Sequence, residues 1–266
     1  MAYSKTFTCT FIGHAISLYT NSDFLYKKET QIIERIQLYM NSYGRYGNSS
    51  FIYPQLGLSK ISEAFIRKSF INGAIYNLNK DIEEILYDEN GKFLGIKSQN
   101  EEIYGKLLIA EPSYVKKFGK VKSIGKIFTR ICILNHSVPN TENYDSCLII
   151  VPDKEIFLKN NDIIISVLNS TNQVCEKGYY LAIISTVVET DYPKKEIEPA
   201  MNIIGPTLEI FDKVSDILVP NENDFKDNIF ITKSYDAQIH FEDDMEDVFE
   251  IYEKITGQKL ELDTDI

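Results

Sequence analysis

The sequence predicts a mixed protein of the α+β or α/β class that contains more than one sheet. Its 266 residues are 44% hydrophobic, which is enough for one large or two smaller cores. Apolar residues recur at helical spacing near both ends of the chain. Between these ends, short β-branched runs alternate with Asn, Asp and Gly turns. No apolar run approaches the roughly 18 residues of a membrane helix, so we expect a soluble protein.

Two helices are predicted in the first part of the chain. The first covers residues 24–44, where isoleucines and a methionine recur at helical spacing. Ser42 and Gly44 indicate the end of this helix. The second begins with Ser59 as its predicted N-cap and ends at Gly73, which suits a left-handed position after a helix. Its apolar residues are predicted to share one face.

The next segment changes to the period of strands. Strands are predicted at residues 82–87, 93–98 and 107–110. Asn90-Gly91 is typical of a tight hairpin turn, and residues 99–102 are predicted as a second turn.

Four further strands are predicted to form an antiparallel sheet. They cover residues 127–134, 146–152, 162–169 and 180–188, which are short, β-branched and separated by turns.

The last part of the chain is predicted to return to helix. A helix is expected from Glu196 to Ile210, with its prolines near the ends, followed by a loop over residues 218–228. Residues 228–235 are predicted as a last strand, and residues 241–257 as a closing helix that ends at a glycine.

Charge and cysteine content favour a cytoplasmic protein that does not bind nucleic acid. The net charge is −11, although residues 1–80 hold nine Lys and Arg against four Asp and Glu. Residues 221–266 carry four Lys against fourteen Asp and Glu, which disfavours nucleic acid or anionic lipid there. The four cysteines form no CxxC pair and are predicted to be reduced thiols. The first residues do not resemble a secretory signal.

Motifs for catalysis, cofactors or metals are not found. His14, His136 and His240 have no ligand at i+3 or i+4, so each is expected to be a packed or surface imidazole. The chain has no nucleophile elbow and no glycine-rich phosphate loop. We therefore predict no catalytic residue, no cofactor and no metal site.

A surface for a protein partner is the remaining candidate. Arg45, Lys60, Arg67, Lys68 and Tyr76 gather in sequence around one glycine-bounded helix. Arg and Tyr are favoured anchors at protein interfaces. Composition alone leaves an alternative open, in which these charges only keep the helix solvated.

Several segments resemble the Rab GDP dissociation inhibitors in order and spacing, from about Gly13 to Leu262. They are "RYGNSSFIYPQLGL", "AFIRKSFINGAIYNLNKDIEEIL", "EPSYVKK", "ICILNHSVPNT", "LAIISTVVETDYPKKEIEPAM", "SDILVP" and "ITKSYDAQIHFEDD". The resemblance implies a multi-sheet domain related to the FAD/NAD(P)-binding monooxygenase fold. On this basis, residues 1–50 would be the C-terminal part of a small helical, lipid-binding domain, and residues 51–266 that of the main Rab-binding domain. The first half of such proteins, with its dinucleotide-type loop, has no counterpart in this sequence.

The resemblance also implies function. Rab GDP dissociation inhibitors bind GDP-bound, prenylated Rab GTPases, slow GDP release, mask the prenyl lipid and recycle the GTPases through the cytosol in vesicle traffic. They are not enzymes, and they touch membranes transiently. We therefore expect a GDP-bound Rab, its prenyl lipid and a transient membrane contact as partners.

A Rab-binding platform can be assigned to this sequence residue by residue. The positions are Arg45, Tyr53, Lys60, Arg67, Ile75, Tyr76 and Asn77. Three of them depart from the family pattern: Lys60 replaces a glutamate, Ile75 a threonine and Asn77 a methionine. A reversed charge at a desolvated contact costs several kcal/mol, so changed specificity or weakened binding is expected.

Two alternatives accompany this interpretation. The chain is a truncated, non-binding paralogue or a fragment if the altered platform and the missing half abolish binding. The second alternative is a substrate domain of a flavoprotein oxidoreductase. The missing dinucleotide loop argues against this alternative.

Overall fold

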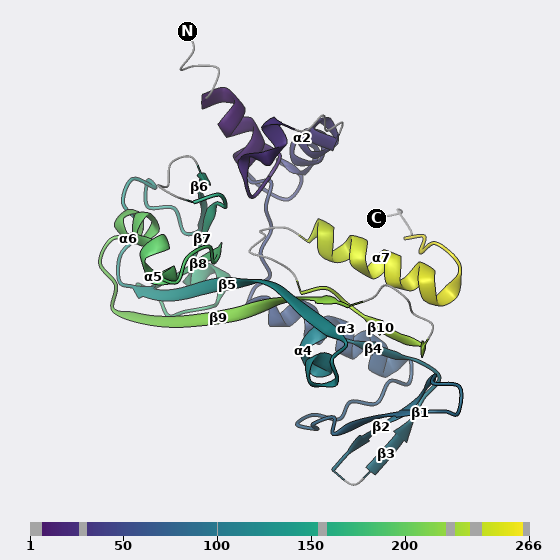
Figure 1. Ribbon diagram of the computed structural model, residues 1–266. Coiled ribbons are helices and arrows are strands. Elements are labelled where there is room, and N and C mark those ends of the chain that lie inside the picture. The colour runs from purple at the N-terminus through teal and green to yellow at the C-terminus, as the bar shows by residue number, and fades with distance from the viewer. Residues whose placement is uncertain are drawn as a thin grey trace. The chain divides into compact units, whose positions relative to one another are not determined.

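The protein divides into two compact units in a computed structural model (Figure 1). The structure describes residues 7–26, 31–99, 101–153, 159–221, 227–234 and 241–262. Unit one consists of residues 1–73, 127–215 and 237–239, and unit two of residues 74–126, 216–236 and 240–266. This division follows spatial contacts, and the predicted domain boundary at residue 50 stays a prediction.

Unit one begins with helical segments. They are a π-helix η1 (Phe11–Ile16), a 3-10 helix η2 (Ser22–Leu25), and the α-helices α2 (Gln31–Ser42) and α3 (Ser59–Ile71). The predicted helix at residues 24–44 is therefore confirmed only as α2. Its first residues belong to η2, and residues 27–30 lie outside the described residues. Neither α2 nor α3 has a buried residue, and the apolar residues Phe65, Phe70 and Ile71 of α3 are exposed.

The N-cap prediction for α3 was wrong. The cap is Leu58, which is helical itself and makes no side-chain bond. The Lys60 and Ile61 N–H groups instead donate to the carbonyls of Gly57 and Leu58, at 3.1 Å in both cases. Because these tight backbone bonds satisfy the first turn, a serine hydroxyl is not required. The end of the helix agrees with the prediction, since Gly73 has a left-handed φ of 92°.

A five-stranded sheet forms the body of unit one. Its order is β6-β7-β8-β5-β9, and the pairs β6–β7, β7–β8 and β5–β8 are antiparallel. The strands are β5 (Val121–Leu134), β6 (Cys147–Val151), β7 (Ile163–Asn169), β8 (Tyr180–Val187) and β9 (Glu209–Pro220), with a 3-10 turn η5 (Ser170–Asn172) after β7. The four predicted strands are confirmed, although β5 begins six residues earlier than expected.

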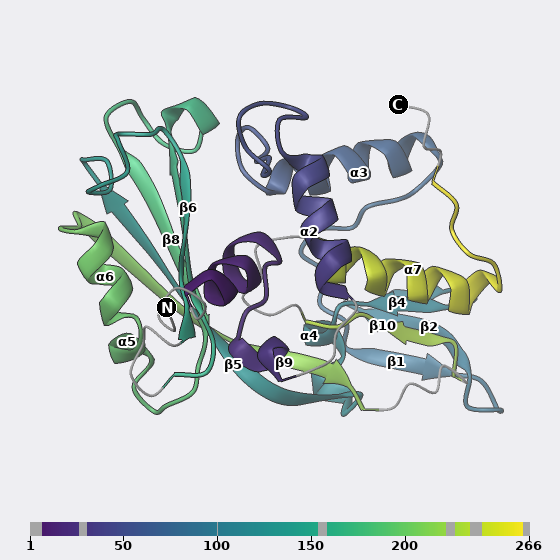
Figure 2. The same cartoon turned by 90° about the horizontal axis from the view of Figure 1, so that it is seen from above.

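One face of this sheet packs against two short helices, α5 (Pro193–Glu196) and α6 (Glu198–Ile204), as Figure 2 shows. Ile197, Ala200 and Ile204 are fully buried against β-branched and aliphatic residues of the strands. Alternate residues of β5 and β8 point into this core, as the period of two requires.

The predicted helix from Glu196 to Ile210 was wrong beyond Ile204. Gly205 ends α6 with a positive φ of 80°, and the Leu208 N–H then donates to the Ile133 carbonyl of β5 at 2.8 Å. The chain continues as β9, whose first six residues are exposed. Because burial does not alternate along this part of β9, its sequence lacks the apolar–polar alternation that predicts a half-buried strand. The loop predicted from residue 218 also begins too early, because β9 extends to Pro220.

Unit two is built in three layers, visible in Figure 1. Its middle layer is a parallel pair, β4 (Leu108–Ala110) and β10 (Ile229–Ile231). An antiparallel sheet of β1 (Glu84–Tyr87), β2 (Phe93–Ser98) and β3 (Glu101–Tyr104) lies on one side, and α7 (Glu242–Thr256) on the other. A short helix α4 (Pro112–Val115) and a 3-10 turn η3 (Lys116–Phe118) follow β4.

Predictions for unit two were mostly confirmed. The β1–β2 hairpin turns at Asn90-Gly91, where the Asp88 N–H donates to the Lys92 carbonyl at 2.8 Å. The second turn, predicted at residues 99–102, was wrong in part because Glu101 and Glu102 belong to β3. All four residues of β3 are exposed, so this polar edge strand lacks apolar alternation. The last strand is confirmed but shorter than predicted, and the closing helix ends at a left-handed Gly257.

Replacing Ile184 with alanine tests the core of unit one. Ile184 lies on β8 and is fully buried, so its truncation leaves a cavity. We expect the free energy of unfolding to fall by about 2–5 kcal/mol in urea denaturation followed by circular dichroism. Ile210→Ala is the control, because Ile210 is exposed on β9 of the same unit. Equal losses in the two variants would contradict the core described above.

Candidate functional site

The candidate binding surface of unit one lies on α3 and the loop that precedes it. Arg67 is exposed in the last two turns of α3 and has no hydrogen bond or ion pair within the part of the chain that the structure describes. Lys60 lies about two turns earlier and forms an ion pair with Glu63 at 2.6 Å. This pair is solvent-exposed, so it contributes little to stability and leaves Lys60 available to a partner.

The loop before α3 is anchored to the sheet of unit one. The Leu56 N–H donates to the carbonyl of Asn172, in η5, at 2.9 Å. Tyr53 is half-buried in this loop, and burial raises the pKa of its hydroxyl. A hydrogen bond with the Leu58 backbone lowers this pKa but does not cancel the effect of burial. Arg45 is exposed beyond α2 and stacks on the Tyr46 ring, with its guanidinium carbon 5.4 Å from the ring centroid. This loop therefore carries an aromatic side chain, Tyr53, and a cation, Arg45, and a backbone hydrogen bond joins it to the sheet.

The remaining candidate residues follow Gly73 and belong to unit two. Ile75 is 86% exposed, and Tyr76 and Asn77 are exposed beside it in a segment without regular structure. The structure thus places Arg45, Tyr53, Lys60 and Arg67 in unit one and residues 75–77 in unit two. Their common role in binding stays a prediction.

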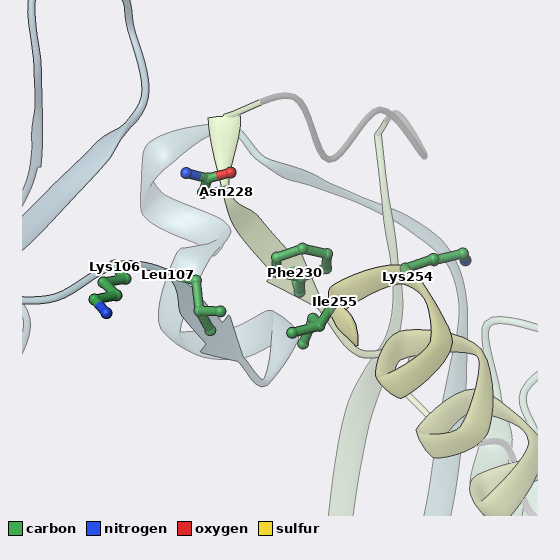
Figure 3. Close-up of a pocket in the computed structure, with 6 residues that line it drawn as sticks. All are labelled: Lys106, Leu107, Asn228, Phe230, Lys254 and Ile255. Atoms are coloured by element: carbon green, nitrogen blue, oxygen red, sulfur yellow. The ribbon is translucent and has the colours of Figure 1, made fainter. Parts of the chain in front are cut away.

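A pocket of about 460 Å³ lies in unit two, between the start of β4 and the end of α7 (Figure 3). Leu107, Phe230 and Ile255 supply its apolar lining. Lys106, Asn228 and Lys254 supply its polar lining. No residue of this pocket belongs to the predicted platform.

Sequence reasoning missed a buried polar cluster around His14. The His14 Nδ1 atom lies 2.6 Å from Asp162 Oδ2, and its Nε2 atom lies 3.4 Å from Ser22 Oγ. The Ser22 hydroxyl in turn donates to Asp153 Oδ1 at 2.7 Å. Burial raises the pKa of the Asp162 carboxyl, and the hydrogen bond with His14 opposes part of that rise. The cluster joins residues 14–22 to the connection between β6 and β7.

His14, Asp153 and Asp162 also have the composition of a metal site, since their ligand atoms lie within 4.8 Å of one another. Their hydrogen bonds already satisfy these atoms, because Asp153 accepts twice from Ser22 and Asp162 accepts from the Asp153 N–H. No sequence signal could have found this cluster, because its members lie up to 148 residues apart.

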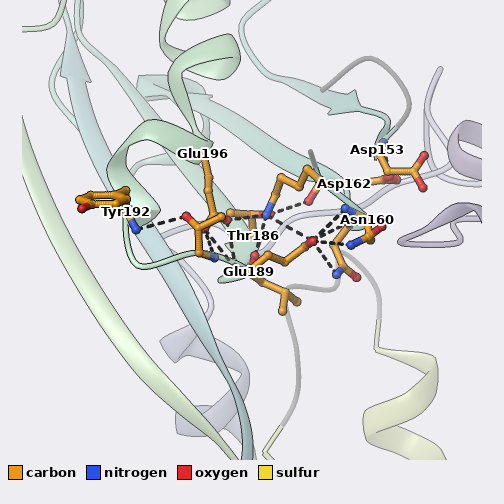
Figure 4. Close-up of polar contacts among 11 residues, drawn as sticks. Asp153, Asn160, Asp162, Thr186, Glu189, Tyr192 and Glu196 are labelled. Carbon is orange, nitrogen blue, oxygen red and sulfur yellow. Dashed lines mark hydrogen bonds and ion pairs between the residues drawn. The ribbon is translucent and has the colours of Figure 1, made fainter. Parts of the chain in front are cut away.

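A second buried cluster surrounds Lys159, and Figure 4 labels its members Asn160, Glu189 and Glu196. The Lys159 ammonium donates to Glu196 Oε2 and to the Val187 carbonyl, at 2.7 Å in both cases, and lies 3.6 Å from Glu189. Although burial raises the pKa of the Glu196 carboxyl, hydrogen bonds from Lys159 and Thr190 outweigh it and lower the pKa overall. The pKa of the Glu189 carboxyl is lowered in the same way. Burial raises this pKa, but hydrogen bonds from Asn161 and Asn160 and the charge of Lys159 outweigh the effect of burial.

Both clusters are buried, and neither of them lines the pocket described above. Their geometry serves to hold loops against the sheet.

The fold defines the class of protein. The crystal structure of Rab GDI from Plasmodium falciparum matches this structure with a TM-score of 0.89 and 41% sequence identity, over 96% of this chain and 57% of that chain. The predicted GDI-like multi-sheet fold is confirmed by this match. The further relation to the flavin monooxygenase fold, which the resemblance implies, stays a prediction.

The chain belongs to the GDP dissociation inhibitor (GDI) family, because the sequence model of this family matches residues 3–265. The Rab GDP-dissociation inhibitor of Saccharomyces cerevisiae is 44% identical over 257 residues, covering 96% of this chain and 56% of that protein. The Rab GDP dissociation inhibitor beta of Canis lupus familiaris is 41% identical over 253 residues, covering 95% of this chain and 56% of that protein.

The chain spans somewhat more than half the length of the curated relatives it matches. Among the residues that the structure describes, none of the helices is both long and apolar enough to cross a bilayer. The four cysteines are all free thiols, as predicted.

Glu196→Gln tests the Lys159 cluster. Both side chains are almost fully buried, so the variant leaves the Lys159 charge poorly paired, and we expect a loss of about 3 kcal/mol at pH 7. Because folding lowers the pKa of Glu196, its contribution is present above the pKa of the unfolded state and is lost as pH falls through the folded value. The difference between variant and wild type should therefore shrink below about pH 4 in denaturation series.

Glu198→Gln is the matched control for this experiment. Glu198 lies two residues further along and is exposed on α6. We expect a change in unfolding free energy below about 0.5 kcal/mol at either pH. A pH-independent loss in the Glu196 variant would show that the pairing is not ionic.

Proposed function

We propose that this chain is a regulator of the Rab GDP-dissociation inhibitor type. It would bind a GDP-bound, prenylated Rab GTPase, slow the release of GDP and keep the GTPase soluble for recycling in vesicle traffic. Membership of the GDI family across residues 3–265 is the observation that carries this proposal. The relatives from yeast and dog bear the name of this activity.

The Rab-binding platform is proposed as Arg45, Tyr53, Lys60, Arg67, Ile75, Tyr76 and Asn77. Exposure supports the proposal, since Arg67 and Ile75 are open to solvent and Arg67 has no intramolecular partner among the described residues. An exposed arginine without a partner is a favoured anchor at interfaces. The anchored loop before α3 would present Tyr53 without a large cost in ordering.

The proposed domain roles follow the family. Residues 1–50 would be part of the helical domain that shields the prenyl lipid, and residues 51–266 part of the main domain. The protein would act in the cytoplasm, with transient contact to membranes when it takes up its partner. The proposed activity is binding alone, without catalysis or cofactor.

Arg67→Ala tests the platform. Removing an interface arginine typically costs about 2 kcal/mol, so we expect the Kd for a GDP-loaded, prenylated Rab GTPase to rise roughly 30-fold in calorimetry. Lys213→Ala is the control, because Lys213 is an exposed cation on β9 of the same unit and lies outside the candidate surface around α3. The Saccharomyces cerevisiae relative serves as the positive control for binding. Folded protein that fails to bind while this relative binds would favour the alternative of a non-binding paralogue.

Lys60→Glu tests the charge that departs from the family. The substitution restores the acidic residue expected at this position, so affinity for the same GTPase should increase about tenfold if a cation faces it in the complex. Lys60→Gln separates restored attraction from relieved repulsion, because it removes the positive charge without adding a negative one. Weaker binding of Lys60→Glu would indicate that this chain has adapted to an acidic partner surface.

A further inference from the structure

We propose that unit two carries a lysine surface that contacts the anionic phospholipid headgroups of a membrane. This lysine surface follows α4, in η3 and at the start of β5, and consists of Lys116, Lys117, Lys122, Ile124 and Lys126. The proposal deepens the proposed function, because it names a place for the transient membrane contact. Its test contains no GTPase, so the two can fail separately.

Positive charge is concentrated in one short segment of this acidic chain. Residues 113–126, "SYVKKFGKVKSIGK", hold five Lys and no Asp or Glu. The whole chain has a net charge of −11, so the other residues carry −16 once these five positive charges are taken away. At physiological ionic strength, charges are screened beyond about 8 Å. The local charge of the segment, and not the net charge of the chain, therefore decides what it attracts.

Folding brings lysines from both parts of this segment together. Lys116 of η3 forms an ion pair with Asp216 of β9, with 2.5 Å between Nζ and Oδ2. The hydrogen bond and charge of Lys116 lower the pKa of the Asp216 carboxyl, and the charge of Lys126 lowers it further. Lys116 and Lys126 therefore lie around one carboxylate. Because one carboxylate carries a single negative charge, it leaves a net positive charge on this pair of lysines.

The start of β5 adds exposed side chains to the lysine surface. Lys122, Ile124 and Lys126 alternate along the strand, so they point to the same side of it. All three are exposed, and Ile124 is 62% exposed. Lys122 has no ion pair or hydrogen bond within the described ranges. The Lys117 ammonium lies 5.0 Å from the centroid of the Phe118 ring. Neither of these two ammonium groups is therefore neutralised by a described carboxylate.

Unit two carries opposite charges on the two sides of the β4–β10 pair. The segment of α7 holds seven Asp and Glu against one Lys. This helix lies on one side of the pair, and α4 lies on the other (Figure 1). Lys116 directly follows the last residue of α4, so the lysine surface begins on the side away from α7. An anionic plane attracts this side and repels α7, which favours one orientation of unit two on a membrane.

The residue types of the lysine surface favour a membrane over an acidic polypeptide. Residues 113–126 contain no Arg, which is the residue preferred for two-point recognition of a carboxylate. Lysines act as flexible point charges, and several of them together are typical of contact with anionic lipid. Ile124 lies between Lys122 and Lys126 on the same side of β5. An aliphatic side chain among lysines suits the membrane interface, where it enters the apolar boundary while the ammonium groups remain at the headgroups.

The lysine surface is also separate from the pockets of unit two. The pocket at the start of β4 is lined by other residues, and so is a smaller one of about 330 Å³ beside α7. A small anion is usually held in a concave site with converging polar groups. Lysines spread over η3 and an exposed strand instead suit an extended anionic plane.

The experiment measures sedimentation of the full 266-residue chain with lipid vesicles. One set of vesicles contains phosphatidylcholine with about one third phosphatidylserine, and the other contains phosphatidylcholine alone. We expect the partition coefficient to be at least about fivefold higher for the phosphatidylserine vesicles at about 0.1 M salt. This difference should disappear at about 0.5 M salt, because the contact is electrostatic and becomes screened.

Lys122→Glu is the test variant, and Lys259→Glu is its matched control. Lys259 is exposed in the same unit and follows α7, outside the lysine surface. Both variants change the net charge of the chain by the same amount. We expect partition into phosphatidylserine vesicles to fall at least about fivefold with Lys122→Glu and less than about twofold with Lys259→Glu. Circular dichroism of each variant checks that the chain itself still folds.

Three results would overturn the proposal. One is folded protein that sediments no better with phosphatidylserine vesicles than with phosphatidylcholine alone. Another is an equal loss in the two glutamate variants, since net charge and not the lysine surface would then control the contact. The third is binding of labelled polyglutamate by a chain that ignores both kinds of vesicle, which would assign the surface to an acidic polypeptide. Loss of GTPase binding would leave all of these readouts unchanged.

Discussion

The connection between β6 and β7 depends on the pairing of buried charge. On one side, Asp153 and Asp162 meet His14 and Ser22 from the first helical segment. On the other side, Lys159 meets Glu196, which α5 contributes. Removing one member of a buried charged pair leaves the other without compensation, at a cost of about 3–5 kcal/mol. This constraint holds two segments distant in sequence against a single connection of the sheet.

Charged side chains in the interior of unit one are paired, whereas the side chains of its outer helix α3 are exposed. The charged groups of the two buried clusters are hydrogen-bonded within the protein, so these clusters have no unpaired charge to offer a ligand. On α3, by contrast, apolar residues and Arg67 face outward. A protein surface of this composition is typical of binding sites. In unit one, exposed apolar and cationic side chains therefore lie on α3, whereas the buried polar side chains are paired with one another.

Sequence by itself determined the elements that have a clear local pattern. The strand at residues 180–187 alternates between buried and half-buried residues, the strands at residues 147–151 and 163–169 are β-branched runs between turns, and the closing helix has apolar residues at helical spacing. The segments of family resemblance indicated the fold class. Tertiary structure alone decided the edge strands β3 and β9, because neither alternates between core and solvent over most of its length. It also decided the His14 and Lys159 clusters, since their partners are brought together only by folding. Local periodicity reports how one element meets the core, whereas buried ion pairs and open edges depend on which distant elements become neighbours.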